Sequence, residues 1–158
     1  MSIEAVKKHL ETFGLADRVR EFDVSSATVE LAAAALGTEG ARIAKTISIY
    51  GKEGGCILIV TAGDYKIDNA KCKATLGLKP KMLTPEDAIV MTGHAVGGVC
   101  PFALPEGVTV YLDESLKRFD TVYPAAGSSN SAVALTPDEL LLASGALSFE
   151  DLCKPREA

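Results

Sequence analysis

The chain has 158 residues, a formal net charge of −5, and 47% hydrophobic and 23% charged side chains. This balance is typical of one folded domain with a sizeable core, and it excludes intrinsic disorder. The acidic balance argues against a general DNA-binding or membrane-binding surface, and no apolar run is long enough to span a bilayer. Residues 1–5 lack the pattern of a signal peptide, so we expect a cytoplasmic protein with reduced cysteines.

Two helices are predicted at the start of the chain. The first begins near Ser2, a suitable capping residue, and stops at Gly14. Its apolar face is expected to contain Ala5, Leu10 and Phe13. Residues 28–36 predict a second helix that ends at Gly37.

A β-hairpin is predicted next. Residues 43–50 and 56–62 are rich in β-branched and apolar side chains, and the segment that joins them contains three glycines. A polar helix over residues 67–76 follows and stops at Gly77.

The second half of the chain alternates short elements. Helices are predicted from Thr84 to Thr92 and from Thr136 to about Gly145, because each begins with a capping threonine followed by proline. Strands are predicted over residues 108–112, 121–126 and 132–135. The polar tail after Cys153 is expected to fray.

This order of elements predicts an α/β fold of the α+β kind. Strands and helices are mixed without strict βαβ alternation, so we expect a mixed, barrel-like β-sheet with flanking helices. The chain length predicts a single domain over residues 1–158.

Lys45 is unusual because it stands inside an apolar strand. By the period of two, it shares one face with Ile43, Ile47 and Ile49. A buried ammonium needs a partner or a water-filled cleft, which indicates a site for a phosphate or carboxyl group. Alternatively, its stem lies along the sheet edge and its amine stays in water. These two interpretations are equally open.

The loop over residues 92–102 is the strongest candidate for a site. It places three glycines and Pro101 around His94 and Cys100. Glycine lets backbone N–H groups approach a ligand closely, and such amides can hold a carbonyl or a developing oxyanion. No spacing matches a Walker A loop or a dinucleotide-binding fingerprint, so we expect no nucleoside triphosphate site.

His94 and Cys100 also form a candidate base and nucleophile. Most isolated cysteines behave as small hydrophobic side chains, so inert packing is the stronger interpretation of Cys100. The chain has only two histidines, His9 and His94, without metal-ligand spacing. We therefore expect no metal and no cofactor.

Two further segments are candidates for contact with a ligand. Residues 66–81 contain five lysines and one aspartate, which gives a local charge of +4 on an acidic protein. This stripe is either a solvated helix face or a phosphate-contacting patch. Residues 23–27 carry hydroxyl groups that could line a pocket, although turn formation explains them equally well.

Several motifs occur together in an order that resembles the YbaK/ProX-type family, which is related to the editing domain inserted in bacterial prolyl-tRNA synthetases. The resemblance covers about residues 22–145. Its landmarks are Thr28-Val-Glu-Leu-Ala-Ala, Ile43-Ala-Lys45-Thr-Ile, Gly63-Asp-Tyr-Lys-Ile-Asp68, Thr92-Gly93, Gly97-Gly-Val-Cys-Pro101-Phe102, Tyr111-Leu-Asp113, Ala126-Gly127-Ser128 and Thr136-Pro-Asp-Glu-Leu140.

The resemblance implies hydrolysis of the ester that joins a wrong amino acid to the tRNA 3′-terminal adenosine. It implies that Lys45 contacts the terminal nucleotide and that the loop over residues 97–101, with Gly97 and Gly98 as catalytic positions, presents amides to the aminoacyl group. The attacking group is then a water molecule or a substrate group, without a protein nucleophile.

The same resemblance assigns further positions. The substrate-binding residues would be Thr28, Thr46, His94, Val99, Cys100, Pro101, Gly127 and Ser128. The tRNA phosphate contacts would be Lys66, Lys71 and Lys73. The implied partners are the 3′ end of a mischarged tRNA, with prolyl-tRNA synthetase as a candidate, and neither DNA nor a membrane.

The implied substrate is tRNA-Pro carrying cysteine, alanine or another small amino acid. Members directed at Cys-tRNA tend to carry Ser-Pro and then a glycine with paired lysines, whereas this chain has Cys100-Pro101-Phe102 without a basic pair. That departure leaves alanine, serine and threonine open. Two other functions stay open: a non-catalytic module that binds an aminoacyl or nucleotide group in the same cleft, and a thiol hydrolase that uses Cys100 and His94.

Overall fold

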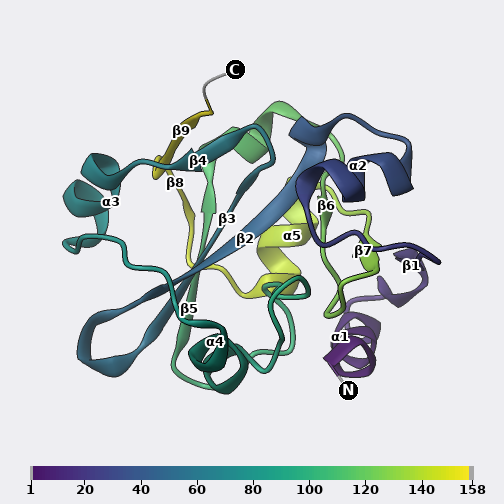
Figure 1. Ribbon diagram of the computed structural model, residues 1–158, viewed down its shortest axis with the longest axis horizontal. Helices are drawn as coiled ribbons and strands as arrows, with labels where there is room; N and C mark the ends of the chain where they lie inside the picture. Colours follow the sequence, from purple (N-terminus) through teal and green to yellow (C-terminus); the bar gives the residue numbers. More distant parts are fainter. Residues whose placement is uncertain (1, 157–158) are drawn as a thin grey trace.

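A five-stranded mixed sheet forms the centre of the computed structural model, which describes residues 2–156 (Figure 1). The strand order is β6-β2-β3-β5-β8. The strands are β2 (Ile43–Tyr50), β3 (Cys56–Ala62), β5 (Val108–Asp113), β6 (Tyr123–Pro124) and β8 (Phe149–Glu150). β2 and β3 are antiparallel, and every other pair in this sheet is parallel. The predicted hairpin is therefore the middle of the sheet.

Two small ribbons flank the central sheet. β1 (Val19–Glu21) pairs with β7 (Ser131–Val133), and β4 (Tyr65–Ile67) pairs with β9 (Cys153–Pro155), both antiparallel. The mixed α/β fold class is confirmed, and the central sheet is open rather than a closed barrel.

The expectation of a frayed C-terminal tail is wrong up to Arg156. Residues 153–155 form β9, and the Arg156 N–H donates to the Asp64 carbonyl at 2.8 Å. The buried Asp113 carboxylate anchors the segment, because its Oδ1 accepts hydrogen bonds from the Leu152 and Cys153 N–H groups, both at 2.9 Å. The last two residues lie outside the described part of the chain.

Five α-helices pack around the sheets in residues 2–156. They are α1 (Ser2–Glu11), α2 (Val29–Leu36), α3 (Asn69–Leu76), α4 (Pro85–Thr92) and α5 (Pro137–Ser144). Short 3₁₀ turns occupy Ala16–Arg18, Gly40–Arg42, Lys52–Gly54 and Glu114–Arg118. Within the described residues, no helix is long and apolar enough to cross a membrane.

Local capping explains the four later helices. Thr28, Asp68, Thr84 and Thr136 each accept a hydrogen bond from a backbone N–H of the first helical turn. Glycines in the left-handed conformation follow each helix, as the sequence predicted.

The first helix differs from its prediction. Ser2 lies inside α1, and its hydroxyl donates to the Gly127 carbonyl instead of capping the helix. The buried face consists of Ile3, Val6 and Leu10, which follow the helical period. Ala5 is exposed, and Phe13 lies beyond the helix end with 37% of its surface accessible.

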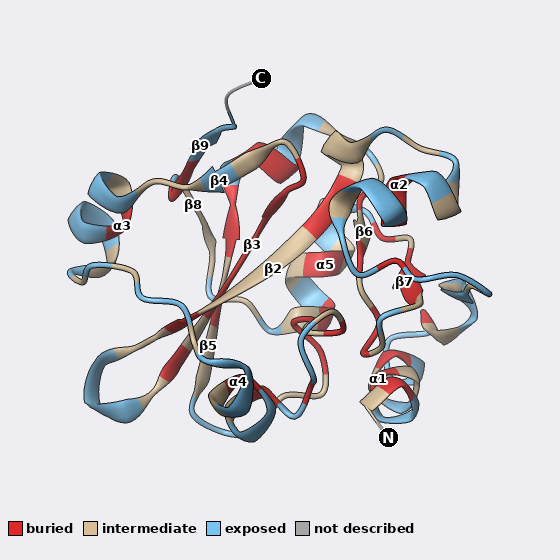
Figure 2. Ribbon diagram, viewed as in Figure 1, coloured by how far each residue is buried: buried red, intermediate tan, exposed pale blue. Residues whose placement is uncertain are grey.

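Apolar side chains pack on both faces of the central sheet. Leu58 and Val60 of β3 belong to the larger core, whereas Ile59 between them belongs to a second core with Ile49 and Leu152. This alternation follows the period of two. Figure 2 shows β3 buried along most of its length, so the sheet is a rigid support for whatever lies along its edge.

Candidate functional site

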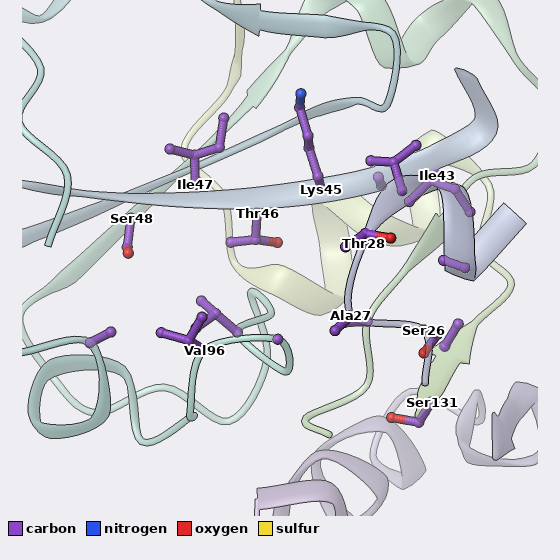
Figure 3. A pocket seen from close by; sticks show the side chains of 18 of the residues that line it. Ser26, Ala27, Thr28, Ile43, Lys45, Thr46, Ile47, Ser48, Val96 and Ser131 are labelled. Atoms are coloured by element: carbon purple, nitrogen blue, oxygen red, sulfur yellow. The ribbon is translucent and has the colours of Figure 1, made fainter. Parts of the chain in front are cut away.

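A cavity of about 430 Å³ opens along the edge of β2 (Figure 3). It lies between β2, the segment over residues 26–29 that leads into α2, the start of α4, and the loop over residues 96–99. Most of its lining side chains are small or aliphatic, which is typical of a pocket for a small ligand with a few polar groups.

The edge of β2 is unpaired where it meets the cavity. β6 pairs with β2 only at residues 43 and 44. Farther along, the Tyr50 N–H donates to the Lys81 carbonyl at 2.9 Å, and the Leu83 N–H donates to the Ser48 carbonyl at 3.1 Å. Since alternate residues of a strand direct their main-chain groups to the same side, the N–H and C=O of Thr46 face this open edge.

Thr46 adds an unpaired side-chain group at the same place. Its Oγ1 is buried and has no hydrogen-bond partner among residues 2–156. Buried hydroxyls in folded proteins nearly always have a partner, so Thr46 is an open donor and acceptor for a ligand. The sequence assigned Thr46 and Thr28 to substrate binding, and both line the cavity.

Lys45 projects from the opposite face of β2. In Figure 3 the side chains of Lys45 and Ile47 extend to one side of the strand, and those of Thr46 and Ser48 extend to the other, where Val96 lies. Lys45 forms no ion pair within the described residues. Its amine is therefore available on the rim, across the open edge from the loop.

The environment of Lys45 links it to the C-terminal strand. Burial lowers the pKa of the Lys45 amine, and the Arg156 guanidinium lowers it further, while Cys153, Asp64 and Glu30 act in the opposite direction. The largest of these effects is burial, so a ligand anion beside the amine would stabilise its charged form.

The glycine loop packs directly against the chain near Ser128. A Cβ on Gly98 would lie 2.8 Å from the Ser128 N and 2.9 Å from the Gly127 carbonyl carbon, so no larger residue fits. Gly97 has a φ of +94°, a conformation that glycine favours. The structure thus brings Gly97, Gly98, Gly127 and Ser128 together, although they come from two distant segments.

The amides of the loop differ in their availability. The Gly98 N–H donates to the Ala95 carbonyl at 2.9 Å, so it is engaged within the turn. The N–H groups of Gly97 and Val99 have no acceptor in the part of the chain that the structure describes, and both residues line the cavity. The cavity wall therefore contains unpaired amides at Gly97 and Val99, and the Val96 N–H on the same wall also has no acceptor within residues 2–156.

His94 and Cys100 lie behind the loop rather than in the cavity. His94 Nε2 is 2.8 Å from the Phe102 carbonyl and 3.6 Å from Cys100 Sγ. Burial lowers the pKa of His94, and it raises the pKa of the Cys100 thiol to about 12. The pair therefore consists of a neutral ring and a protonated thiol, without access to the ligand.

Hydrogen bonds around His94 brace both ends of the loop. The Thr92 hydroxyl donates to the Ala88 carbonyl at 2.6 Å, and the His94 N–H donates to Thr92 Oγ1 at 3.1 Å. Pro101 and Phe102 are also buried. These residues shape the cavity wall from outside instead of touching its contents.

Sequence reasoning missed part of the wall. Ser131, Ser48 and Val96 line the cavity, and nothing in their local pattern set them apart. Ser128 was predicted, and its hydroxyl lies 2.6 Å from Ser131 Oγ, behind the wall. Ser26, from the hydroxyl-rich segment, lines the cavity and donates to the Ser129 carbonyl at 3.3 Å.

The three lysines predicted to contact phosphate lie outside the cavity lining. Lys66 is exposed on β4, and Lys73 is exposed on α3. The Lys71 amine donates to Asp151 Oδ1 at 2.8 Å and to the Cys153 carbonyl at 2.9 Å, so it is engaged within the protein. No group of three or more His, Cys, Asp or Glu among residues 2–156 could hold a metal.

The fold and the cavity together define a class: a small mixed α/β domain whose pocket combines an open strand edge, unpaired loop amides and a lysine on the rim. Residues 23–142 match the family model described as the aminoacyl-tRNA editing domain. The chain belongs to this family, and the resemblance found in the sequence is confirmed.

Similar proteins agree with this assignment. YwhH of Bacillus subtilis (strain 168), described as uncharacterized, is 50% identical over 157 residues, which cover 99% of this chain and 100% of that protein. EbsC of Enterococcus faecalis (strain ATCC 700802 / V583), named as a candidate Cys-tRNA(Pro)/Cys-tRNA(Cys) deacylase, is 30% identical over 115 residues, covering 72% of this chain and 70% of EbsC. A crystal structure described as a candidate trans-editing enzyme for prolyl-tRNA synthetase is 33% identical, has a TM-score of 0.87 and covers 97% of both chains.

Proposed function

We propose that the chain is a free-standing deacylase that hydrolyses the aminoacyl ester of mischarged tRNA. The observation that carries this proposal is the cavity at the open edge of β2, where Thr46 and the Gly97 and Val99 amides offer unpaired polar groups. Membership of the aminoacyl-tRNA editing family supports the same reaction class.

The substrate would lie across the edge of β2. The aminoacyl group enters the cavity on the Thr46 side, and the phosphate of the terminal adenosine lies on the Lys45 side. An ammonium beside a phosphate forms a charge-assisted hydrogen bond, which orients the nucleotide. Contact with a phosphate would explain why a lysine occupies a strand face otherwise formed by isoleucines.

The chemical step would depend on positioned backbone groups. A water molecule or a substrate hydroxyl attacks the ester carbonyl, and the oxyanion that forms accepts hydrogen bonds from the Gly97 and Val99 N–H groups. The ribose oxygen that carried the ester then leaves and takes up the proton that the attacking group loses. Attack by water releases the free amino acid directly, whereas an ester formed by attack of a substrate hydroxyl is hydrolysed by water in a second step. Either route consumes one water molecule. Since the Cys100 thiol is buried and protonated, it does not serve as the nucleophile.

The small walls of the cavity favour a small amino acid. Ala27, Ala88, Ala132 and Val99 leave limited room beside Thr46. We therefore propose alanine, cysteine or a residue of similar size on tRNA-Pro, with prolyl-tRNA synthetase as the enzyme whose errors are corrected. The names of EbsC and of the similar crystal structure are the support for tRNA-Pro.

A panel of mischarged tRNAs tests the proposal. We expect wild type to deacylate at least one of them and Lys45→Ala to lose activity about 10- to 100-fold, the value of a hydrogen bond to a charged group. Lys52→Ala is the matched control, because this exposed lysine lies in the hairpin turn, outside the cavity lining.

Two results would count against the proposal: no deacylation of any tRNA, or full activity in Lys45→Ala. Saturable binding of an aminoacyl-adenosine analogue without turnover would instead support the binding-module function. Loss of activity in Cys100→Ala with normal folding would support the thiol hydrolase.

A further inference from the structure

The β4–β9 ribbon has one apolar and one basic face. Tyr65, Ile67 and Cys153 pack into or against the second core. Lys66 and Lys154, which alternate with these residues, are exposed. The ribbon therefore presents its lysines to solvent on the face that points away from the core.

The two lysines stand directly opposite each other. Lys66 on β4 and Lys154 on β9 are Cα partners in the antiparallel register. Like charges directly opposite on a two-stranded ribbon are destabilising, and nothing in the packing of the ribbon requires them. Arg156 lies two residues beyond Lys154, so it continues the outer, basic face of the ribbon. Its backbone N–H donates to the Asp64 carbonyl, which extends the hydrogen bonding between the two strands.

These three cations differ from two basic neighbours, Lys71 and Arg118, in how they are paired. Within residues 2–156, Lys66, Lys154 and Arg156 form no ion pair. In contrast, Lys71 bonds Asp151, and Arg118 bonds both carboxylate oxygens of Asp64 at 2.6 and 3.1 Å. Lys71 and Arg118 are thus held by carboxylates, whereas the cations on the outer face of the ribbon are not held in an ion pair.

The Arg156 end of the β4–β9 ribbon lies next to the Lys45 side of the candidate site. Lys45 is the Cα partner of Thr61 near the end of β3, and the chain then turns through residues 63–64 into β4. The Arg156 N–H donates to the Asp64 carbonyl at this turn, at 2.8 Å, and the Arg156 guanidinium also acts on the Lys45 amine. A chain of phosphates that starts at Lys45 would therefore meet Arg156 next, and Lys154 and Lys66 beyond it.

We infer that the outer face of the β4–β9 ribbon, formed by Lys66, Lys154 and Arg156, binds the phosphate backbone of the RNA whose 3′ end enters the cavity. The inference rests on the proposed function. It also relocates the main RNA contact from α3, where Lys71 is already engaged, to a strand near the C-terminus.

Charge reversal on the ribbon separates this role from a structural one. Lys154→Glu places a carboxylate opposite Lys66, so the ribbon gains a favourable cross-strand pair and the melting temperature should not fall. Lys8→Glu is the control, because Lys8 is exposed on α1, which lies at the opposite side of the molecule from β9 in Figure 1.

Binding of uncharged tRNA is measured first, by fluorescence anisotropy at 50 to 200 mM salt. We expect Lys154→Glu and Arg156→Glu to weaken binding and to reduce the magnitude of the salt slope by about one for each contact removed. Lys8→Glu should bind as wild type does. Unchanged affinity and slope in both ribbon variants would overturn the inference.

Deacylation of two substrates completes the test. With a mischarged full-length tRNA, Lys154→Glu should raise KM and leave kcat unchanged, and with an aminoacyl ester of adenosine both constants should match wild type. An equal loss on both substrates would show a structural defect and overturn the inference. If wild type hydrolyses neither substrate, the proposed function fails, and the binding measurement still decides the role of the ribbon.

Discussion

The glycine loop at residues 92–102 and the β4–β9 ribbon differ in the groups that they expose to a ligand. The loop is braced by buried groups such as His94 and Phe102 and offers only backbone amides to the cavity. The ribbon offers exposed charges that form no ion pair within residues 2–156.

This difference has a physical reason. A developing oxyanion requires donors fixed to a fraction of an ångström, and a packed backbone provides them. A polyanionic backbone requires only charge at roughly the right distance, and its contribution weakens with salt. Changes in the loop should therefore alter the rate of the chemical step, and changes in the ribbon should alter affinity.

The largest effect is expected for Gly98→Ala. The added Cβ would meet the Ser128 N at 2.8 Å, so the loop must move away from the segment that supports it. A shift of about 1 Å in a positioned group lowers the rate about 100-fold. The measurement is kcat for a mischarged tRNA, with tRNA affinity unchanged.

Gly145→Ala is the control for this substitution. Gly145 has a φ of +68° with no atom within 4 Å of a Cβ, so alanine there costs about 1–2 kcal/mol of stability without touching the site. Activity below the melting temperature should be normal. Equal kcat losses in both glycine variants would show that the loop geometry has no special role.

Thr46→Val should separate ligand binding from stability. The Thr46 hydroxyl has no partner within residues 2–156, so an isosteric valine should leave the melting temperature unchanged or raise it. Loss of one ligand hydrogen bond lowers kcat/KM about 2- to 10-fold. The buried Thr61 hydroxyl lies 3.2 Å from Ser115 Oγ, so Thr61→Val should instead lower the melting temperature. If Thr46→Val is less stable than wild type and has a normal kcat/KM, the Thr46 hydroxyl does not bind the ligand.

The brace behind the loop should depend on pH through His94. Since burial lowers the pKa of His94, the unfolded chain takes up a proton before the folded chain does. Stability is then complete above the ordinary histidine pKa of about 6.5 and falls as the pH drops below it. His94→Gln can still donate to the Phe102 carbonyl and cannot titrate.

Urea midpoints between pH 5 and 8 measure this dependence. We expect the wild-type midpoint to fall more steeply toward pH 5 than that of His94→Gln. Parallel curves for the two proteins would show that His94 does not titrate with unfolding.

The sequence predicted the elements whose signals are local. Helices that start at Thr84-Pro85 and Thr136-Pro137 carry their caps within four residues, and these caps are present in the structure. The strands β1, β4, β8 and β9 were missed, because each has two or three residues and pairs with a segment far away in the chain. Such short strands show no period that distinguishes them from loops.

The sequence predicted those parts of the candidate site in which a residue differs in character from its sequence neighbours. Lys45 among isoleucines and the glycines of the loop stood out for that reason. His94 and Cys100 were placed on the right loop, but only the packing showed that they lie behind the wall. Lys66 was already part of the predicted basic stripe. Ser131, Lys154 and Arg156 depend on pairings across the fold, which no local pattern revealed.

The smallest effect is expected for Lys71→Ala, which tests whether all basic residues near the ribbon are equivalent. The Lys71 amine is occupied by Asp151 and the Cys153 carbonyl, and its pKa is raised mainly by the hydrogen bond to Asp151. Its removal should therefore lower the melting temperature slightly, through the anchoring of β9, while the salt slope of tRNA binding stays at the wild-type value. A slope reduced as much as in Lys154→Glu would show that Lys71 exchanges its carboxylate for phosphate when RNA binds, and the RNA-binding surface would then extend from the ribbon onto α3.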